Sequence, residues 1–175
     1  MKKFEKDTDK YNIKALVGKY IKEILEQDVN HFKISKYNLC NLILMRFSLN
    51  YTSNFSENTP FEEREYLQFT LHKENVVYYS EMKKNSPNMS ESEMIREIFS
   101  SYAILPPFLR EIYLFREKIA FIVSMKKEYK EIKFHTTEGI VEGRIEELYR
   151  NRTNNYLEIK INSRKYYVSQ IEITG

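Results

Sequence analysis

The sequence predicts an α+β protein in which a helical N-terminal half precedes a small antiparallel β domain. Apolar residues recur mainly at three- and four-residue spacing over residues 1–128, and at two-residue spacing over residues 129–175. This change of period predicts a helical domain over the first range and a β domain over the second. With 175 residues, 42% of them apolar, the chain is long enough to bury a core.

Composition excludes several classes of protein. The single cysteine excludes a disulfide framework and a cysteine-rich zinc site. No apolar run approaches the roughly 18 residues that span a bilayer, and the charged N-terminus leads into no signal-peptide core. We therefore expect a cytoplasmic protein with no membrane partner. The net charge is only +3, and basic and acidic residues are evenly mixed along the chain. Any nucleic-acid contact therefore has to come from local geometry.

Helical spacing dominates the N-terminal half. Pro87 ends one helix, and the Ser90-to-Glu93 stretch predicts a capping box that begins the next. Residues 51–60 are rich in Ser, Thr and Asn and predict a surface loop. The predicted helices span residues 12–27, 38–49, 74–84, 90–102 and 108–127.

Two short segments, residues 31–36 and 66–72, alternate apolar and polar side chains as half-buried strands do. In the second segment the polar face carries Gln68, Thr70 and His72. After residue 129, four further strands are expected as a meander. Its turns are predicted at Asn154-Asn155 and Asn162-Ser163, because Asn and Ser favour turn conformations.

The strand–helix–break–helix order of residues 66–103 resembles the ribbon-helix-helix DNA-binding fold. In that family two antiparallel strands enter the major groove, their outward side chains contact bases, and the second helix binds phosphate. The residues that this resemblance places at the nucleic acid are Gln68, Thr70, His72, Ser90 and Ser92. An ordinary α+β protein can contain the same order, so this alternative stays open.

Residues 31–49 repeat the strand–helix order, with Lys33 and Ser35 on the outward side of the predicted strand. The chain could therefore supply both ribbon strands itself, or each strand could pair with its equivalent in a homodimer. We favour the internal pair, because unpaired strand edges are costly. A two-stranded sheet that only ties helices together is the alternative.

Three motifs of the C-terminal part resemble a degenerate WYL domain, a small Sm- or SH3-like β fold. They are GIVEGR at residues 139–144, NYL at 155–157 and RKYYVSQI at 164–171. Asn155 replaces the Trp of the family, and Gln170 stands where an Arg is usual. WYL domains occur in bacterial regulators and CRISPR accessory proteins, some with a ribbon-helix-helix part, and bind nucleic-acid ligands. The resemblance implies such a ligand here.

Arginine and tyrosine side chains of this domain are of the types that bind single-stranded nucleic acid. Guanidinium groups bind phosphates, and aromatic faces stack on bases. The candidates are Arg144, Arg152, Arg164 and Tyr156. Glutamates are interleaved with them, so the alternative is that these residues only cover solvent-facing strands.

Catalytic chemistry has little support. The three histidines are far apart without metal-ligand spacing, Cys40 lies in an apolar stripe typical of a core, and no phosphate-binding Gly-rich loop is present. We expect no enzyme activity, metal or cofactor. The sequence predicts a nucleic-acid-binding regulatory protein, with duplex DNA, single-stranded RNA or both as partner. The alternative is a protein-interaction module, such as a CRISPR effector accessory subunit or a phage-encoded inhibitor, which the balanced charge favours.

Overall fold

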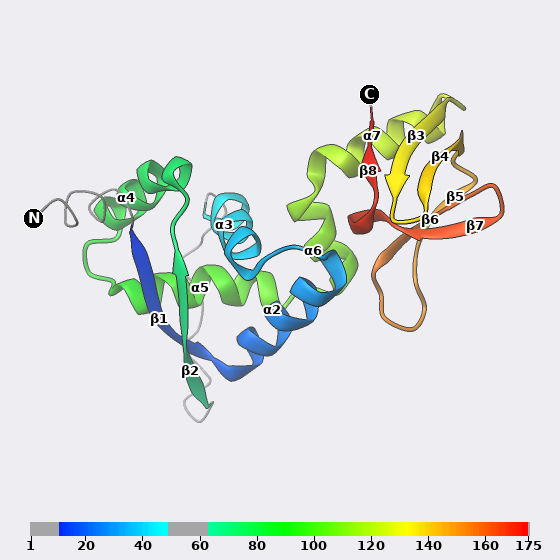
Figure 1. Cartoon of the computed structure of the whole chain (residues 1–175). Helices are drawn as coiled ribbons and strands as arrows, with labels where there is room; N and C mark the ends of the chain where they lie inside the picture. Colours follow the sequence, from blue (N-terminus) through cyan, green and yellow to red (C-terminus); the bar gives the residue numbers. More distant parts are fainter. Residues whose placement is uncertain (1–10, 49–62, 175) are drawn as a thin grey trace, which may run out of the picture. The chain divides into compact units, whose positions relative to one another are not determined.

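The computed structural model describes residues 11–48 and 63–174, which belong to two compact units (Figure 1). Unit 1 is Met1–Ile104 and unit 2 is Leu105–Gly175. Helices and small antiparallel sheets make up both units, which confirms the predicted α+β class. The predicted loop at residues 51–60 lies outside the described residues.

Unit 1 contains the order strand–helix–helix twice. The first set is β1 (Asn12–Gly18), α2 (Lys19–Phe32) and α3 (Lys36–Phe47). The second set is β2 (Arg64–Thr70), α4 (Val76–Asn85) and α5 (Glu91–Ala103), with a 3-10 turn, η1 (Lys73–Asn75), before α4. The two strands pair antiparallel along their whole length, from Asn12 opposite Thr70 to Gly18 opposite Arg64.

Residues 12–18 form a strand, so the prediction of a helix over residues 12–27 is wrong at its start. Ile13, Ala15 and Val17 alternate on the buried face, and the helix begins only at Lys19. The same segment also has helical spacing. Pairing with β2, far along the chain, supplies backbone partners for the strand, and this tertiary context decides between the two patterns.

The predicted strand at residues 31–36 is also wrong. Helix α2 continues to Phe32, and Lys33 ends it in the left-handed conformation, with φ 60°. Ser35 then caps α3, because its hydroxyl accepts the Asn38 N–H at 3.1 Å. The alternation therefore reflects a helix end followed by a helix start. The ribbon does form within one chain, but its first strand is β1.

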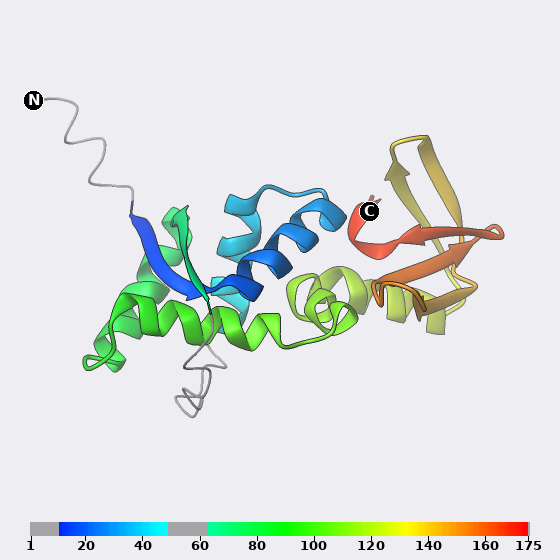
Figure 2. The ribbon, with the colours of Figure 1, turned by 90° about the horizontal axis from the view of Figure 1, so that it is seen from below.

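The inner face of the ribbon is buried against helices of unit 1. Ala15 and Leu67, which lie opposite each other at the middle of the ribbon, are both 0% exposed. The rings of Phe69 and Phe99 pack with centroids 5.8 Å apart, which joins β2 to α5. Figures 1 and 2 show α5 running along one side of both strands. Ser90 caps its N-terminus, since Ser90 Oγ accepts the Glu93 N–H at 3.2 Å, which is the serine half of the predicted capping box.

Unit 2 consists of two helices and two three-stranded antiparallel sheets, ordered β4-β3-β8 and β5-β6-β7. Its elements are α6 (Pro107–Leu114), α7 (Arg116–Lys127), β3 (Glu131–Thr136), β4 (Gly139–Arg144), β5 (Glu147–Arg150), β6 (Leu157–Ile161), β7 (Arg164–Tyr167), a 3-10 turn η2 (Val168–Gln170) and β8 (Glu172–Ile173). The run predicted as one strand over residues 139–149 is thus two strands in different sheets. The predicted turns occur, with positive φ at Asn155, Asn162 and Ser163.

The helix predicted over residues 108–127 is broken at Phe115, whose φ of −112° and ψ of 39° are not helical. Both resulting helices belong to unit 2, so the units meet at residues 104/105 rather than at the expected 128/129. Hydrogen bonds from each helix attach them to the rest of unit 2. Glu111 Oε2 accepts the Leu157 N–H at 2.6 Å, and Lys118 Nζ donates to the Ile171 carbonyl at 2.8 Å.

Gly143 of β4 lies against the turn between β6 and β7. A Cβ at this position would lie 2.8 Å from Asn162 Oδ1 and 2.9 Å from Ile161 Cγ2. The Asn162 amide also donates to the Glu142 carbonyl at 3.1 Å, which fixes the turn against β4. The absent side chain is therefore what lets the two sheets approach at this point.

We predict that Gly143→Ala lowers the free energy of unfolding of unit 2 by about 1–3 kcal/mol, because the methyl group displaces the turn. Urea denaturation of the full chain measures this change. Glu142→Ala is the matched control, since its side chain is exposed on the same strand. Equal unfolding curves for the parent and the Gly143→Ala variant would contradict the role of the close approach.

Candidate nucleic-acid interface

The ribbon face opposite the buried one carries a row of alternate side chains, which we call the outer row. Side chains of directly paired residues share a face of an antiparallel sheet, so the strand register defines the row. Its members are Asn12, Lys14, Leu16, Arg64, Tyr66, Gln68 and Thr70. It contains two cations and no carboxylate.

Contacts within the outer row hold several of its side chains in place. Lys14 Nζ lies 4.5 Å from the centre of the Tyr66 ring, which is 55% exposed. Thr70 Oγ1 donates a hydrogen bond to Asn12 Oδ1 at 2.8 Å. Gln68 is exposed between these two contacts, opposite Lys14. The row is therefore a partly ordered polar surface, with Gln68 and Thr70 on the exposed side as predicted.

Side chains of α5 cover the free edge of β1. The Leu16 N–H donates to Ser92 Oγ at 3.2 Å, and Arg96 Nε donates to the Leu16 carbonyl at 3.1 Å. The Lys14 N–H lies 3.4 Å from Glu91 Oε1. These bonds hold the ribbon on α5. Ser92, predicted to contact a nucleic-acid backbone, is half-buried and has this structural role instead.

Asn41 of α3 holds the end of β2. Its Nδ2 donates to the Thr70 carbonyl at 3.0 Å, and its Oδ1 accepts the His72 N–H at 2.6 Å. The His72 ring stacks on Tyr37, with centroids 4.9 Å apart. His72 therefore lies beyond the end of the strand and packs against α3, outside the outer row.

The first residue of α5, Glu91, is the centre of a hydrogen-bonded cluster. Its Oε2 accepts the hydroxyl of Tyr11 at 2.7 Å and that of Tyr79, and it forms an ion pair with Lys83 at 3.4 Å. Burial alone would raise the pKa of Glu91, but the hydrogen bonds from Tyr79 and Tyr11 outweigh burial and lower the pKa below its ordinary value. Burial and the bond to this carboxylate raise the pKa of Tyr79.

The helix N-terminus that would hold a phosphate in the ribbon-helix-helix family thus already carries an ionised carboxylate. N–H groups at a helix start favour an anion, and Glu91 supplies it. Ser90 is exposed, but its hydroxyl bonds to its own helix. A phosphate close to Ser90 would meet the charge of Glu91, so the geometry weighs against a backbone contact there.

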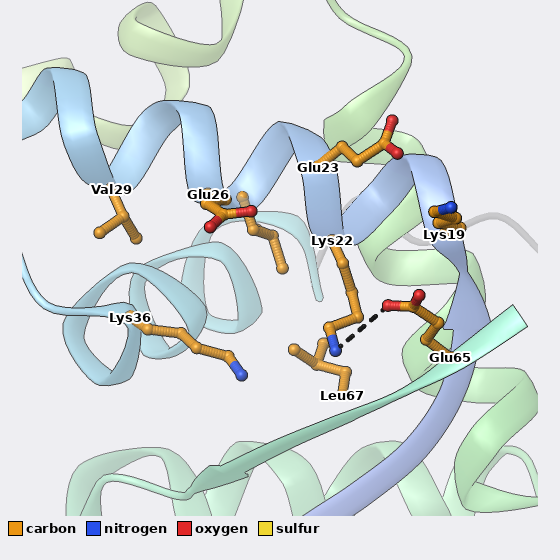
Figure 3. Close-up of a pocket in the computed structure, with 9 residues that line it drawn as sticks. Lys19, Lys22, Glu23, Glu26, Val29, Lys36, Glu65 and Leu67 are labelled. Carbon is orange, nitrogen blue, oxygen red and sulfur yellow. Dashed lines mark ion pairs between the residues drawn. The ribbon is translucent and has the colours of Figure 1, made fainter.

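Lys33 and Ser35 are exposed in the connection between α2 and α3, not on the ribbon. A groove of about 460 Å³ lies near them, between α2, Lys36 at the start of α3, and β2 (Figure 3). In it, Lys22 Nζ forms an ion pair with Glu65 Oε2 at 3.4 Å. Three lysines and three glutamates line the groove, so neither charge dominates and no ligand is assigned to it.

The residues predicted to bind nucleic acid in unit 2 do not all lie in one cluster. Tyr156 is only 2% exposed, so its ring belongs to the core and cannot stack on a base; this prediction is wrong. Arg144, Arg152 and Arg164 are exposed. Arg152 precedes β6 and Arg164 follows it, so these two lie toward opposite ends of that strand.

A buried glutamate, Glu158, accepts side-chain hydrogen bonds on one face of the β5-β6-β7 sheet. Glu158 is 5% exposed and accepts the Tyr149 hydroxyl at 2.8 Å as well as a bond from Asn151. Burial, with the hydrogen bond to Glu158, raises the pKa of Tyr149 to about 12. Asn154 donates to the Tyr167 hydroxyl at 3.0 Å. The polar groups of this face satisfy one another, which leaves fewer of them for a ligand.

No three His, Cys, Asp or Glu side chains form a metal site within residues 11–48 and 63–174. Cys40 is fully buried, and burial raises the pKa of its thiol to about 12, so the thiol is protonated at neutral pH. Across the same residues, every helix is too short or too polar to cross a membrane.

We predict that Glu91→Gln lowers the free energy of unfolding of unit 1 by about 1 kcal/mol at pH 7, because charge-assisted hydrogen bonds weaken. A carboxyl group with a depressed folded pKa contributes stability above its unfolded pKa, and this is lost as the pH falls through the folded value. The difference from the parent should therefore shrink as the pH falls from about 5 to 3.

Denaturation at a series of pH values measures this difference. Glu93→Gln, an exposed position on the same helix, is the control and should show little change. A destabilisation by Glu91→Gln that stays constant across the pH range would show that the charge of Glu91 is not responsible.

No protein-family model matches the chain, and neither does any curated protein. A solved structure described as that of a CRISPR Cas-related protein superposes on 94% of this chain with a TM-score of 0.65, at 11% sequence identity. This chain spans 63% of the length of that protein. The two proteins therefore share a fold that includes both units.

Proposed function

We propose that the chain is a nucleic-acid-binding regulatory protein that contacts duplex DNA through the outer row. The supporting observation is the row itself, a two-stranded antiparallel ribbon whose exposed face has cations and hydrogen-bonding groups but no carboxylate. The major groove of B-DNA is about 12 Å wide and admits such a ribbon. The buried inner face and the bonds to α5 would hold the ribbon rigid during binding.

The side chains of the row match the chemistry of base edges. The amides of Asn12 and Gln68 can bond to adenine, which offers both a donor and an acceptor in the major groove. Arg64 can bond both acceptors of guanine, and Leu16 can contact the methyl group of thymine. Sequence preference is therefore expected from the row, rather than charge attraction alone.

The fold likeness supports a role in a CRISPR-associated system, because the similar structure is that of a CRISPR Cas-related protein. A CRISPR effector is then a candidate protein partner. The proposed role requires a cytoplasmic location. Single-stranded RNA is a weaker candidate ligand, because Tyr156 is buried and Arg152 and Arg164 lie toward opposite ends of β6.

We predict that Lys14→Ala and Gln68→Ala each weaken duplex binding by about 1–3 kcal/mol while the protein stays folded, because both side chains are exposed. Fluorescence anisotropy measures this with two labelled probes, duplex DNA from upstream of the protein's own gene and single-stranded RNA of mixed sequence, each at two salt concentrations. Lys133→Ala, an exposed lysine of β3 in unit 2, is the matched control for lost charge.

Equal losses from Lys14→Ala and Lys133→Ala would indicate charge attraction without a ribbon contact. Binding of the RNA probe that Lys14→Ala leaves unchanged would move the function to unit 2. Absence of binding to both probes would favour the protein-interaction alternative.

A further inference from the structure

The outer row is built from two strands of different sequence, although the ribbon that carries it is symmetric in its backbone. An antiparallel pair has a local twofold axis, which here passes between Ala15 and Leu67 at the middle of the seven paired positions. A half-turn about this axis exchanges Asn12 with Arg64, Lys14 with Tyr66, Leu16 with Gln68 and Gly18 with Thr70. In none of these four exchanges are the two residues of the same type.

The two ends of the row therefore present different chemistry. One end has Asn12 and Thr70, joined by a hydrogen bond, followed by Lys14 opposite Gln68. This end offers amide, hydroxyl and ammonium groups. The other end offers an apolar, an aromatic and a guanidinium side chain, from Leu16, Tyr66 and Arg64.

The flanks of the ribbon differ as well. Beside β1 lies the ionised Glu91, with Lys83 as its ion-pair partner. Beside β2 lies the groove of Figure 3, in which Lys22 forms an ion pair with Glu65 of the strand. The two strands of the ribbon thus have different side chains beside them.

We propose that a single chain recognises a duplex DNA site whose two halves differ in sequence, and that it binds this site in one orientation. The inference rests on the proposed function and specifies the class of DNA bound. Two identical strands would contact two identical half-sites, whereas β1 and β2 would contact unlike ones. Seven residues per strand cover roughly 20 Å, the rise of about six base pairs.

Selection from a pool of duplexes with a randomised centre, using the full chain, tests the sequence class. We expect an enriched consensus without dyad symmetry, occupied by one chain per duplex in native mass spectrometry. A palindromic consensus, with one chain or two, would overturn the inference while leaving the proposed function intact. If no duplex is enriched, the inference and the proposed function fall together.

Orientation is tested with an iron-chelate DNA-cleavage reagent attached to a single new cysteine on the selected duplex. Lys19→Cys follows β1 at the Gly18–Arg64 end, and Lys73→Cys lies beyond the Asn12–Thr70 end. Both positions are exposed, and the buried Cys40 does not compete for the reagent. Each conjugate should cut on one side of the site, and the two should cut on opposite sides. Equal cutting on both sides by each conjugate would overturn the inference.

Two substitutions connect each half-site to its own strand end. Arg64→Ala should relax base preference only in the half cut by the Lys19→Cys conjugate, with a roughly ten- to hundredfold loss of affinity. Gln68→Ala should relax preference only in the other half. Relaxation of both halves by either variant would mean that the chain binds in two orientations.

Discussion

The register between β1 and β2 is the constraint on which the candidate interface depends. Side chains alternate between the two faces of a strand, so a slip of one residue would bury Lys14 or Gln68 and expose Ala15 or Leu67. The inner face forbids this, because Ala15 and Leu67 are both fully buried. The exposed row is thus a consequence of core packing.

Side chains of the neighbouring helices form hydrogen bonds with backbone groups at the free edges of the ribbon. A two-stranded sheet leaves one edge of each strand without backbone partners. Ser92 and Arg96 of α5 satisfy the N–H and carbonyl of Leu16, and Asn41 of α3 satisfies the Thr70 carbonyl. Asn41 and Arg96 each lie six residues after the capping serine of their helix. In each strand–helix–helix set, the residue at this position of the second helix thus bonds to a carbonyl of the strand of the other set: Arg96 to β1 and Asn41 to β2.

The sequence predicts the elements whose pattern is local. The alternation at β2, the cap at Ser90 and the turn at Asn162 and Ser163 are all present, because each depends on residues close together in the chain. The strand β1 could not be distinguished from a helix, because its apolar residues fit both periods. Only the distant partner β2 selects the strand.

The same cause limits what the sequence says about the site. Gln68 and Thr70 were predicted on the exposed face because β2 was identified. Lys14 and Asn12, their partners on β1, were missed because that segment was predicted to be helical. In unit 2, a short motif marked Tyr156 as a candidate ligand contact, but burial depends on the packing of the whole sheet, and the ring lies inside.

Net charge gives no sign of the outer row because strand geometry separates charges that are adjacent in the sequence. Arg64 lies between Glu63 and Glu65 in the sequence, so this three-residue segment has a net negative charge. In the structure Arg64 shares the outer face, whereas Glu65 lies on the other face and pairs with Lys22, and Glu63 pairs with Lys19. Salt bridges to Lys19 and Lys22 thus offset the two carboxylates that flank Arg64 in the sequence. Successive side chains of a strand point to opposite faces, so the acidic Glu65 lies on the other face from its neighbour Arg64. A nearly neutral protein can therefore present a row without acidic side chains.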